Sequence, residues 1–361
     1  MFEQLWKKIV RRNPYSIWDI PALVLWLVSF PYRWVVRYRR ATSSPTVTLD
    51  IPVISVGSVT VGGSGKTPLV AFLAHDLMEQ GISVGIVSSG YRRTGTGSFV
   101  RNGHEVRQLD VADTGDEVML LSHLVPEALF SVHETKSEAA RLLARENRVE
   151  VIIVDDGFQH YGLHRDINLV TYDAALKRRH LKVFPYGMLR EPIDSMAQAD
   201  IVVVTRAKHA VDLNAIKKRL KRINPEADIY HAGFSGHNLI GRERQLPIKY
   251  LEDKSVYLFA GVGNFRALSR QVAALSGDLD YARELSDHQV YSSETMEKIK
   301  REAAEQDSDL ILTTFKDWVK LGDFDFGREI YYLDIAVDLD PGEEKLIADI
   351  VERLKLKVGA A

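Results

Sequence analysis

A glycine-rich segment, placed between an apolar run and a helix-like stretch, is the feature that most constrains this chain. Residues 51–56 are mostly apolar, and residues 60–68 read TVGGSGKTP. Glycines let backbone N–H groups turn inward around phosphate oxygens with no Cβ in the way. The helix that follows adds the positive end of its dipole. A strand, a loop ending in Gly-Lys-Thr and a helix therefore predict a P-loop fold that binds a nucleoside triphosphate.

The residue types in the loop have defined roles in this chemistry. Lys66 would reach the β- and γ-phosphates, and the Thr67 hydroxyl would bind Mg²⁺. The usual spacing GxxxxGK[ST] has glycine at the position of Thr60. The alternative is a glycine-rich turn without a ligand, but a strand, a helix and Lys-Thr in register argue against it. The loop residues predicted to bind the nucleotide are Thr60, Val61, Gly62, Gly63, Ser64, Gly65, Lys66 and Thr67.

Composition limits the class of protein. A chain of 361 residues is long enough for two domains. Its 45% hydrophobic and 27% charged residues are typical of a folded protein. A net charge of −2 gives no sign of a nucleic-acid binder, and the absence of cysteine excludes disulfides, thiolate nucleophiles and Cys-ligated metals.

The first forty residues differ from the rest of the chain. They carry eight Lys or Arg against two acidic residues, a net of +6, which leaves −8 for the remainder. Residues 20–32 contain no charge, but a spanning helix needs roughly twenty apolar residues, and Pro21 and Pro31 bracket this run. No small-residue cleavage site follows, which argues against a signal peptide. The aromatic residues in and around the run include Trp6, Trp18, Trp26, Tyr32 and Trp34.

This pattern favours a helix that lies in, or dips into, the bilayer surface, with aromatic rings at headgroup depth and cations facing anionic lipid. The alternative is an ordinary buried helix with a basic flank. Because the P-loop must meet cytoplasmic nucleotide, we expect the attached domain on the cytoplasmic side.

The rest of the chain alternates strands and helices, which predicts a parallel sheet with helices on both faces. A polar stretch at 224–228 marks a boundary. We expect a membrane-associated helix in 1–40, a P-loop domain in 41–225 and a smaller α/β domain in 226–361. The predicted strands are 53–56, 83–87, 128–132, 151–154, 167–171, 201–204, 255–261, 310–314 and 330–334, and the predicted helices are 67–80, 136–147, 213–223, 293–306 and 342–356.

Two acidic pairs are candidates for phosphoryl-transfer chemistry. The apolar strand at 151–154 ends in Asp155 and Asp156, where a P-loop protein holds Mg²⁺ through oxygen ligands or water. The sequence does not rank the two, and an Asp-Gly turn is the structural alternative. Asp116, in TGDE at 114–117, can cap a helix. It can also take the proton of an acceptor hydroxyl.

Several segments together resemble the bacterial lipid A 4′-kinases, the tetraacyldisaccharide 4′-kinase family. The most specific are VDDGFQHYGLHRD (154–166) and FPYGMLREP (184–192), and Thr60 is what this family's loop looks like. The other matching segments are TVGGSGKTP (60–68), SSGYRR (88–93), TGDE (114–117), LFAGVGN (258–264), SDHQVYS (286–292) and TTFKDWVKL (313–321).

The resemblance implies that the γ-phosphoryl group of ATP is transferred, with Mg²⁺, to a glycolipid. The acceptor would be the 4′-hydroxyl of a tetraacylated glucosamine disaccharide 1-phosphate in lipid A biosynthesis. It further implies two α/β domains whose cleft brings nucleotide and acceptor together. It places the enzyme on the cytoplasmic face of the bacterial inner membrane, peripheral or monotopic. We expect no nucleic acid and no obligate protein partner.

The resemblance also implies residue roles. Asp116 corresponds to the catalytic base, and His288 to a histidine that pairs with it, while Lys66 completes the catalytic set. Tyr91 and Glu117 correspond to nucleotide- or metal-site residues, with Thr67, Asp155 and Asp156 as the other metal candidates. Arg190 and Glu191 are polar groups of the site, and His160 lines it.

Two positions depart from the family pattern, and they support rival interpretations. Ser89 stands where the family usually has arginine, and Phe315 where Glu is common. Both changes would suit a catalytically inactive, membrane-associated scaffold. The TFKD at 314–317 also echoes the Thr/Asn-Lys-x-Asp element that reads guanine, as expected of a membrane-associated P-loop GTPase or ATPase switch.

Overall fold

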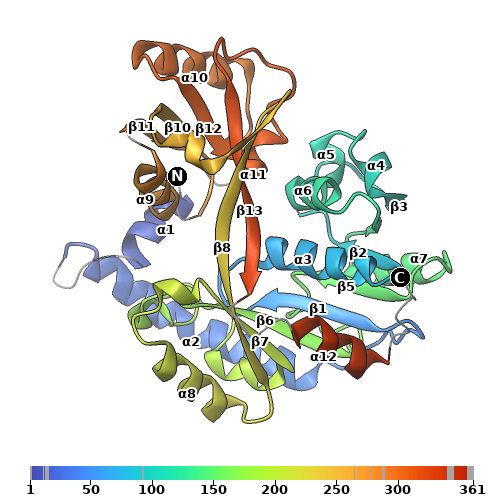
Figure 1. The fold of residues 1–361 in the computed structure, drawn as a ribbon. Helices are drawn as coiled ribbons and strands as arrows, with labels where there is room; N and C mark the ends of the chain where they lie inside the picture. Colours follow the sequence, from blue (N-terminus) through green and yellow to red (C-terminus); the bar gives the residue numbers. More distant parts are fainter. Residues whose placement is uncertain are drawn as a thin grey trace.

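A single mixed sheet connects two lobes of the molecule (Figure 1). The computed structural model describes residues 2–10, 12, 16–91, 93–263, 265–276, 278–286, 289–339 and 345–355. Along this sheet the strand order is β11-β10-β12-β13-β8-β7-β6-β1-β5-β2-β4-β3, and β9 pairs with β8 beside that path. The predicted α/β class with a P-loop-type parallel sheet is confirmed.

Strands β1 to β7 and their helices form the P-loop lobe. Strand β1 lies between β5 and β6, parallel to both. All six of its residues are buried, as expected for a parallel strand that helices cover on both faces. The strands are β1 (Val53–Ser58), β2 (Val84–Ser88), β3 (Phe99–Asn102), β4 (Leu129–Val132), β5 (Val151–Asp155), β6 (Ile167–Asp173) and β7 (Ile201–Thr205).

The three helices predicted for this lobe, α3, α7 and α8, agree with the structure to within three residues at each end, whereas α4 and α5 were not predicted. The largest difference is at α7, which was expected to reach residue 147 and ends at Ala144; Asn147 then adopts a positive φ of 51°. The helices are α3 (Lys66–Glu79), α4 (Gly103–Val106), α5 (Val111–Thr114), α6 (Asp116–Leu124), α7 (Lys136–Ala144), α8 (Leu213–Ile223) and the 3₁₀ turns η1 (Arg178–His180), η2 (Ile193–Gln198) and η3 (Ala207–His209).

Strands β9 to β12 and three helices form the C-terminal lobe. Strand β10 lies between β11 and β12, parallel to both. Apolar residues of β10, β12 and α9 form a core separate from that of the P-loop lobe. The elements are β9 (Gln245–Pro247), η4 (Ile248–Leu251), β10 (Ser255–Ala260), α9 (Phe265–Leu275), β11 (Asp278–Glu284), α10 (Ser293–Glu305), β12 (Leu310–Thr314) and α11 (Phe315–Trp318).

Two long strands, β8 (Asp228–Ile240) and β13 (Ile330–Leu339), join the lobes and run side by side between them (Figure 1). Strand β8 begins parallel to β7 and continues antiparallel to β13. The sequence analysis did not identify β8 and predicted only residues 330–334 of β13. The reason is physical: most of their residues are only half-buried, without the strict alternation that marks a strand with one covered face.

The chain then returns to the P-loop lobe. Helix α12 (Lys345–Leu354) places Leu346, Ile347 and Ile350 in the same core cluster as the apolar face of α3. One smaller domain spanning 226–361 does not account for α12 or for the first half of β8. The division at residue 225 therefore stays a prediction.

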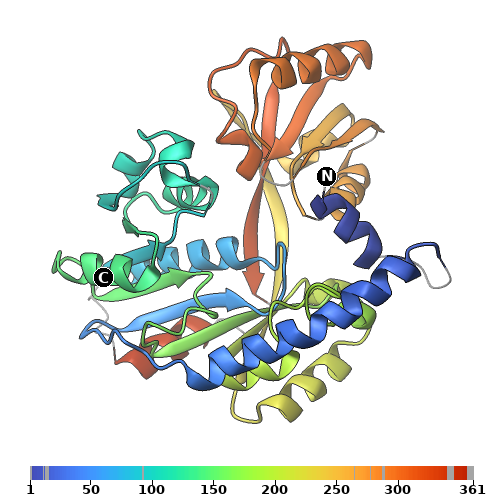
Figure 2. The same ribbon diagram turned by 180° about the vertical axis from the view of Figure 1, so that it is seen from behind.

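Helix α2 lies along the outside of the P-loop lobe and is drawn in blue in Figure 2, whereas α1 extends from it toward the C-terminal lobe in both views. Helix α1 (Phe2–Val10) is followed by α2 (Asp19–Thr42), which continues through Pro31. The uncharged run that Pro21 and Pro31 bracket therefore lies within one longer helix. Helix α2 is long and apolar enough to cross a membrane. Only 6% of its most apolar 18-residue stretch is buried within the protein. The alternative of an ordinary buried helix does not fit this exposure.

The return of α12 can be tested through Ile350, which is fully buried. We expect Ile350→Ala to lower the free energy of unfolding by about 2–5 kcal/mol, because it leaves a cavity in the core of the P-loop lobe. Glu352→Ala, an exposed change on the same helix, should shift it by less than about 0.5 kcal/mol. Denaturant unfolding measures both, and equal effects would mean that α12 is not docked.

Candidate active site

A cleft of about 2630 Å³ contains the predicted phosphate-binding loop and extends to the C-terminal lobe. From the P-loop lobe it is lined by the whole loop, Asp116, Asp155 and Asp156. From the C-terminal lobe it is lined by residues of α9 and α11, among them Arg266 and Lys316. The topology explains this convergence, because parallel strands β1 and β5 bring their carboxyl ends to one edge of the sheet.

The loop has the backbone geometry of a phosphate cradle. Gly62 and Gly65 have φ of 100° and 84°, which side chains other than glycine rarely adopt. A Cβ at Gly65 would collide with the ring of Phe234, so the linking strand β8 packs directly against the loop. Thr60 is not among the described residues with positive φ. Its hydroxyl bonds to that of Ser58 at 2.8 Å, so glycine is not required there.

The family-specific segment at 184–192 runs beside the start of this loop. The Val61 N–H donates to the carbonyl of Met188 at 2.7 Å, and the Arg190 N–H donates to the carbonyl of Val59 at 2.8 Å. These bonds hold both segments in one short antiparallel pairing, with Thr60 opposite Leu189. This pairing places the guanidinium of Arg190 next to the carboxylate of Asp156.

Residues of β6 and β7, and Arg206 directly after β7, form a second set of contacts with the loop, which the sequence analysis did not predict. The hydroxyl of Thr171 bonds to that of Ser64 at 2.8 Å, and the Thr205 hydroxyl donates to the Ser64 carbonyl at 3.0 Å. Arg206 donates to the Gly63 carbonyl at 2.7 Å and pairs with Asp173 at 2.5 Å. The only signal in the sequence was polar residues at the ends of two apolar strands, β6 and β7.

The two adjacent aspartates have opposite electrostatic surroundings. Asp156 has a left-handed φ of 48°. Its Oδ1 lies 3.6 Å from Lys66 Nζ, and its Oδ2 lies 2.6 Å from Arg190 Nη1. Burial opposes ionisation, but the charges of Lys66, Arg190 and Lys136 outweigh it and hold the pKa of Asp156 far below its usual range. Burial, reinforced by the charge of Glu117, instead raises the pKa of Asp155 to about 7.

These carboxylates fit a magnesium ion. Asp155 is 2% exposed, and no hydrogen-bond partner among the described residues reaches its Oδ1. An unsatisfied buried carboxylate beside a second acid is a setting in which a hard divalent cation restores the lost interactions. Lys136, at the start of α7, donates to the carbonyls of Asp155 and Asp156 at 2.6 and 2.7 Å and fixes their turn. The sequence analysis did not identify Lys136.

Asp116 and Glu117 begin α6 directly after Gly115, and both line the cleft. The Lys320 ammonium donates to Asp116 Oδ2 at 2.5 Å, and the exposed fractions of the two side chains are 8% and 16%. His288, the expected partner of Asp116, lies outside the residues that the structure describes.

Of the remaining expected site residues, Tyr91 lines the cleft, whereas Glu191 and His160 are not among the described residues that do. Tyr91 lines the cleft and is 57% exposed. Glu191 is buried and accepts a hydrogen bond from the Tyr161 hydroxyl at 2.5 Å. His160 is not among the described residues that line the cleft. Its Nε2 accepts from the Ser137 N–H at 3.2 Å, and burial lowers its pKa to about 4, so it stabilises the start of α7 as a neutral ring.

The TFKD at 314–317 has a structural explanation. Asp317 is fully buried and accepts from the Gly261 N–H at 3.0 Å and the Thr314 hydroxyl at 2.7 Å. A carboxylate enclosed in this way is not available to read a guanine base. Phe315 stacks on Tyr332 with 4.5 Å between ring centroids and meets the His123 edge at 5.6 Å. Its ring therefore packs at the contact between α11 and α6.

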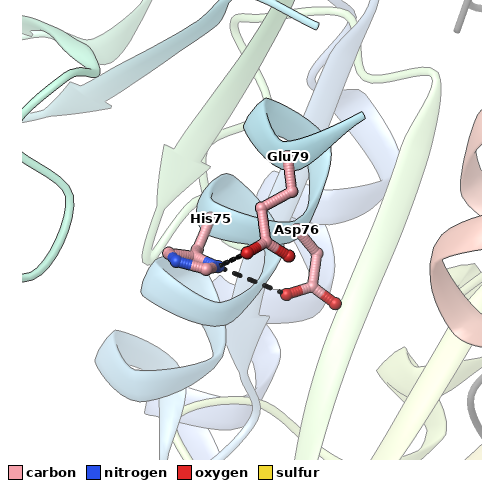
Figure 3. A group of neighbouring side chains, drawn as sticks. All are labelled: His75, Asp76 and Glu79. Carbon is pink, nitrogen blue, oxygen red and sulfur yellow. Dashed lines mark ion pairs between the residues drawn. The ribbon is translucent and has the colours of Figure 1, made fainter. Parts of the chain in front are cut away.

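A separate group of ionisable side chains lies at the far end of α3 (Figure 3). His75 Nδ1 is 3.7 Å from a carboxylate oxygen of both Asp76 and Glu79. His75 and Glu79 are exposed and one helical turn apart. The group is a surface ion-pair cluster, roughly 14 Å along the helix from Lys66 at 1.5 Å per residue.

The raised pKa of Asp155 predicts how stability depends on pH. The metal-free folded protein holds a proton there up to about pH 7, whereas the unfolded chain releases it near 3.8. Asp155 therefore favours folding most below pH 3.8, and this contribution is lost as pH rises through about 7. We expect Asp155→Asn, unfolded in a chelator, to be more stable than the wild type at pH 8 by about 1–3 kcal/mol.

The difference should shrink at pH 5, where Asp155 is protonated in the wild type. Unfolding curves at both pH values measure it. If Asp155→Asn is less stable than the wild type at pH 8, the charge of Asp155 does not destabilise the folded state.

Comparison with known proteins agrees with the site. A model of the family described as tetraacyldisaccharide-1-P 4′-kinase matches residues 21–355. The tetraacyldisaccharide 4′-kinase of Halothermothrix orenii is 31% identical, over 92% of this chain and 93% of that protein. The enzyme of the same name from Geobacter metallireducens is 36% identical, over 83% and 88%.

A solved structure extends the agreement to three dimensions. The crystal structure of LpxK from Aquifex aeolicus in complex with ATP is similar to this fold with a TM-score of 0.74 and 29% identity. It covers 92% of this chain and 99% of that one. The family model matches most of this chain, and the P-loop, the acidic pair and the cleft are all present. This chain therefore belongs to the tetraacyldisaccharide-1-P 4′-kinase family.

Proposed function

We propose that this protein transfers the γ-phosphoryl group of ATP to the 4′-hydroxyl of a tetraacylated glucosamine disaccharide 1-phosphate. The observation that carries the proposal is one cleft that holds the phosphate-binding loop, the Asp155–Asp156 pair and Asp116. Phosphoryl transfer needs a phosphate clamp, a metal site and a group that accepts the hydroxyl proton. The cleft supplies a residue for each.

In this proposal, the loop amides and Lys66 bind the triphosphate. Lys66 already lies in the cleft beside Asp156, so a short movement of its ammonium places it against the phosphate oxygens. Magnesium, when bound, neutralises charge on the β- and γ-phosphates. Thr67, Asp155 and Glu117 would hold it, with Asp155 the better direct ligand because both oxygens of Asp156 face cations.

Asp116 takes the proton from the acceptor hydroxyl as the oxygen attacks phosphorus, and ADP leaves. Asp116 is the first residue of α6 and lines the cleft, so its carboxylate can face a bound acceptor. His288 pairs with Asp116 in this proposal, on the strength of the family motif. Tyr91 completes the nucleotide site at the exposed side of the cleft.

The acceptor reaches the site from a membrane on which the protein sits, at the cytoplasmic face of the inner membrane. Helix α2 exposes many large apolar side chains, and Arg37, Arg39 and Arg40 follow near its end. An exposed apolar face with a basic flank is suited to an anionic bilayer surface. The Tyr32 hydroxyl donates to the Arg190 carbonyl at 3.0 Å, which ties α2 to the segment beside the P-loop.

The rival functions are less well supported. The switch interpretation relied on TFKD, whose Asp317 is enclosed among Gly261 and Thr314. The scaffold interpretation relied on Ser89 and Phe315. Phe315 packs between aromatic rings, and Ser89 lines the cleft without displacing Lys66, Asp116 or Asp155.

A transfer assay tests the function. With labelled ATP and a panel of acylated mono- and disaccharides, we expect product only with acylated disaccharide 1-phosphate, and more with ATP than with GTP. Lys66→Ala should lower kcat/KM by about 10³-fold or more, since it removes a charge that clamps the transferred phosphate. Lys298→Ala, an exposed change on α10, should leave it unchanged. Nucleotide hydrolysis that ignores every acceptor would favour the switch.

Membrane association is tested on the exposed face of α2. Leu23, Leu27 and Phe30 are each at least half exposed. Replacing all three by Gln should lower binding to anionic vesicles by about 30-fold or more, because three apolar side chains no longer leave water. ATP binding should not change. The matched variant Leu23→Ile, Leu27→Ile, Phe30→Leu keeps the apolar face and should stay bound. If the Gln variant also stays bound, another surface docks to the membrane.

A further inference from the structure

The C-terminal lobe reaches the proposed base directly. Lys320 follows α11, and its Nζ donates to Oδ2 of Asp116, at the start of α6 in the P-loop lobe. The two residues are 204 positions apart in the chain. Beside them, the ring of Phe315 meets the edge of His123, so α11 and α6 are also in apolar contact.

The pair is largely withdrawn from water. The side chain of Lys320 is 8% exposed and that of Asp116 is 16% exposed. Asp116 lines the cleft, whereas Lys320 is not among the described residues that do. Lys320 thus contacts the Asp116 carboxylate from the side that does not face the cleft, where nucleotide and acceptor would meet. An ion pair in such surroundings is screened less than one on the surface.

The segment that carries Lys320 is itself held firmly. The Thr314 hydroxyl and the Gly261 N–H both donate to the buried carboxylate of Asp317. The Lys320 N–H donates to the Asp317 carbonyl at 3.0 Å. The ammonium therefore extends from a fixed point of the C-terminal lobe, which makes it a suitable anchor.

We propose that Lys320 is a positioning residue that orients the Asp116 carboxylate for proton abstraction, so that the C-terminal lobe completes the base only when it contacts α6. The proposal rests on the function proposed above, in which Asp116 accepts the hydroxyl proton. A base must lie within hydrogen-bond reach of the proton it takes, with its lone pair aligned. Fixing Oδ2 sets the plane of the carboxylate and restricts its rotation about χ2.

The proton balance leaves Lys320 unchanged. The acceptor O–H bond breaks, its proton moves to Asp116, the oxygen forms a bond to the γ-phosphorus and the bond to ADP breaks. Lys320 takes no part in the proton transfer and touches neither nucleotide nor acceptor. Its effect on the reaction is therefore exerted through Asp116, and removing Asp116 should abolish that effect.

This dependence can be measured with a double-mutant cycle. Wild type, Lys320→Met, Asp116→Asn and the double variant are compared for kcat and KM with ATP and acylated disaccharide 1-phosphate. We expect Lys320→Met to lower kcat by about 10- to 100-fold, less than loss of the base itself, with the KM for ATP nearly constant. In the Asp116→Asn background the same change should have little further effect on kcat.

Two variants set the reference. Lys320→Arg keeps a cation that can reach Asp116 and should recover most of kcat. Lys300→Met removes a lysine of the same lobe that lies near Asp325 at 3.8 Å, outside the cleft, and should leave kcat unchanged. If Lys320→Met does not fold, Lys320→Gln takes its place in the cycle.

The outcomes separate this proposal from the proposed function. If the wild type transfers phosphate but Lys320→Met lowers kcat equally with and without Asp116, Lys320 has only a structural role and the inference fails. Unchanged kcat in Lys320→Met overturns it as well. If the wild type transfers no phosphate to any acceptor, the proposed function fails. The same four proteins in thermal unfolding then report on the pair alone, and an additive cycle would show that the two side chains do not interact.

Discussion

The parallel pairing of β1 with β5 is the constraint on which the rest of the site depends. Its register places Val56 opposite Asp155, so the chain leaves β1 toward the loop just where β5 delivers its two carboxylates. Lys66, in the first turn of α3, then comes within 3.6 Å of Asp156 without any long-range adjustment. Two runs of apolar residues, each buried on both faces, thus bring Lys66 of the glycine-rich loop and the Asp155–Asp156 pair together.

That constraint also explains how two neighbouring aspartates acquire different properties. Asp155 ends the strand with its side chain in the buried layer, where burial and Glu117 disfavour its charge. Asp156 turns into a left-handed conformation and meets Lys66 and Arg190. Asp155 has no ion pair with a cation among the described residues, so it is the acid that would gain most from a metal ion, whereas Asp156 pairs with Lys66 in the cleft. The left-handed backbone conformation of Asp156 therefore gives the two neighbouring carboxylates different surroundings.

The sequence predicted the parts of the fold and site that depend on local pattern. The strand–loop–helix unit and the strand ending in Asp155 are read from adjacent residues, and both are confirmed. Arg206 and Lys136 were missed because their contacts depend on which strands become neighbours, and nothing local marks them. The β8–β13 link was missed because most of its described residues are only half-buried, without the alternation that marks a strand with one covered face.

The segment at 184–192 links three features that the sequence analysis treated separately. Its backbone pairs with the start of the phosphate-binding loop, and its Arg190 carbonyl accepts from Tyr32 of α2. The guanidinium of the same residue pairs with Asp156. A displacement of α2 would therefore act on the residue that pairs with Asp156. In the function proposed above, α2 rests on the membrane that carries the acceptor, and Arg190 connects this helix to Asp156.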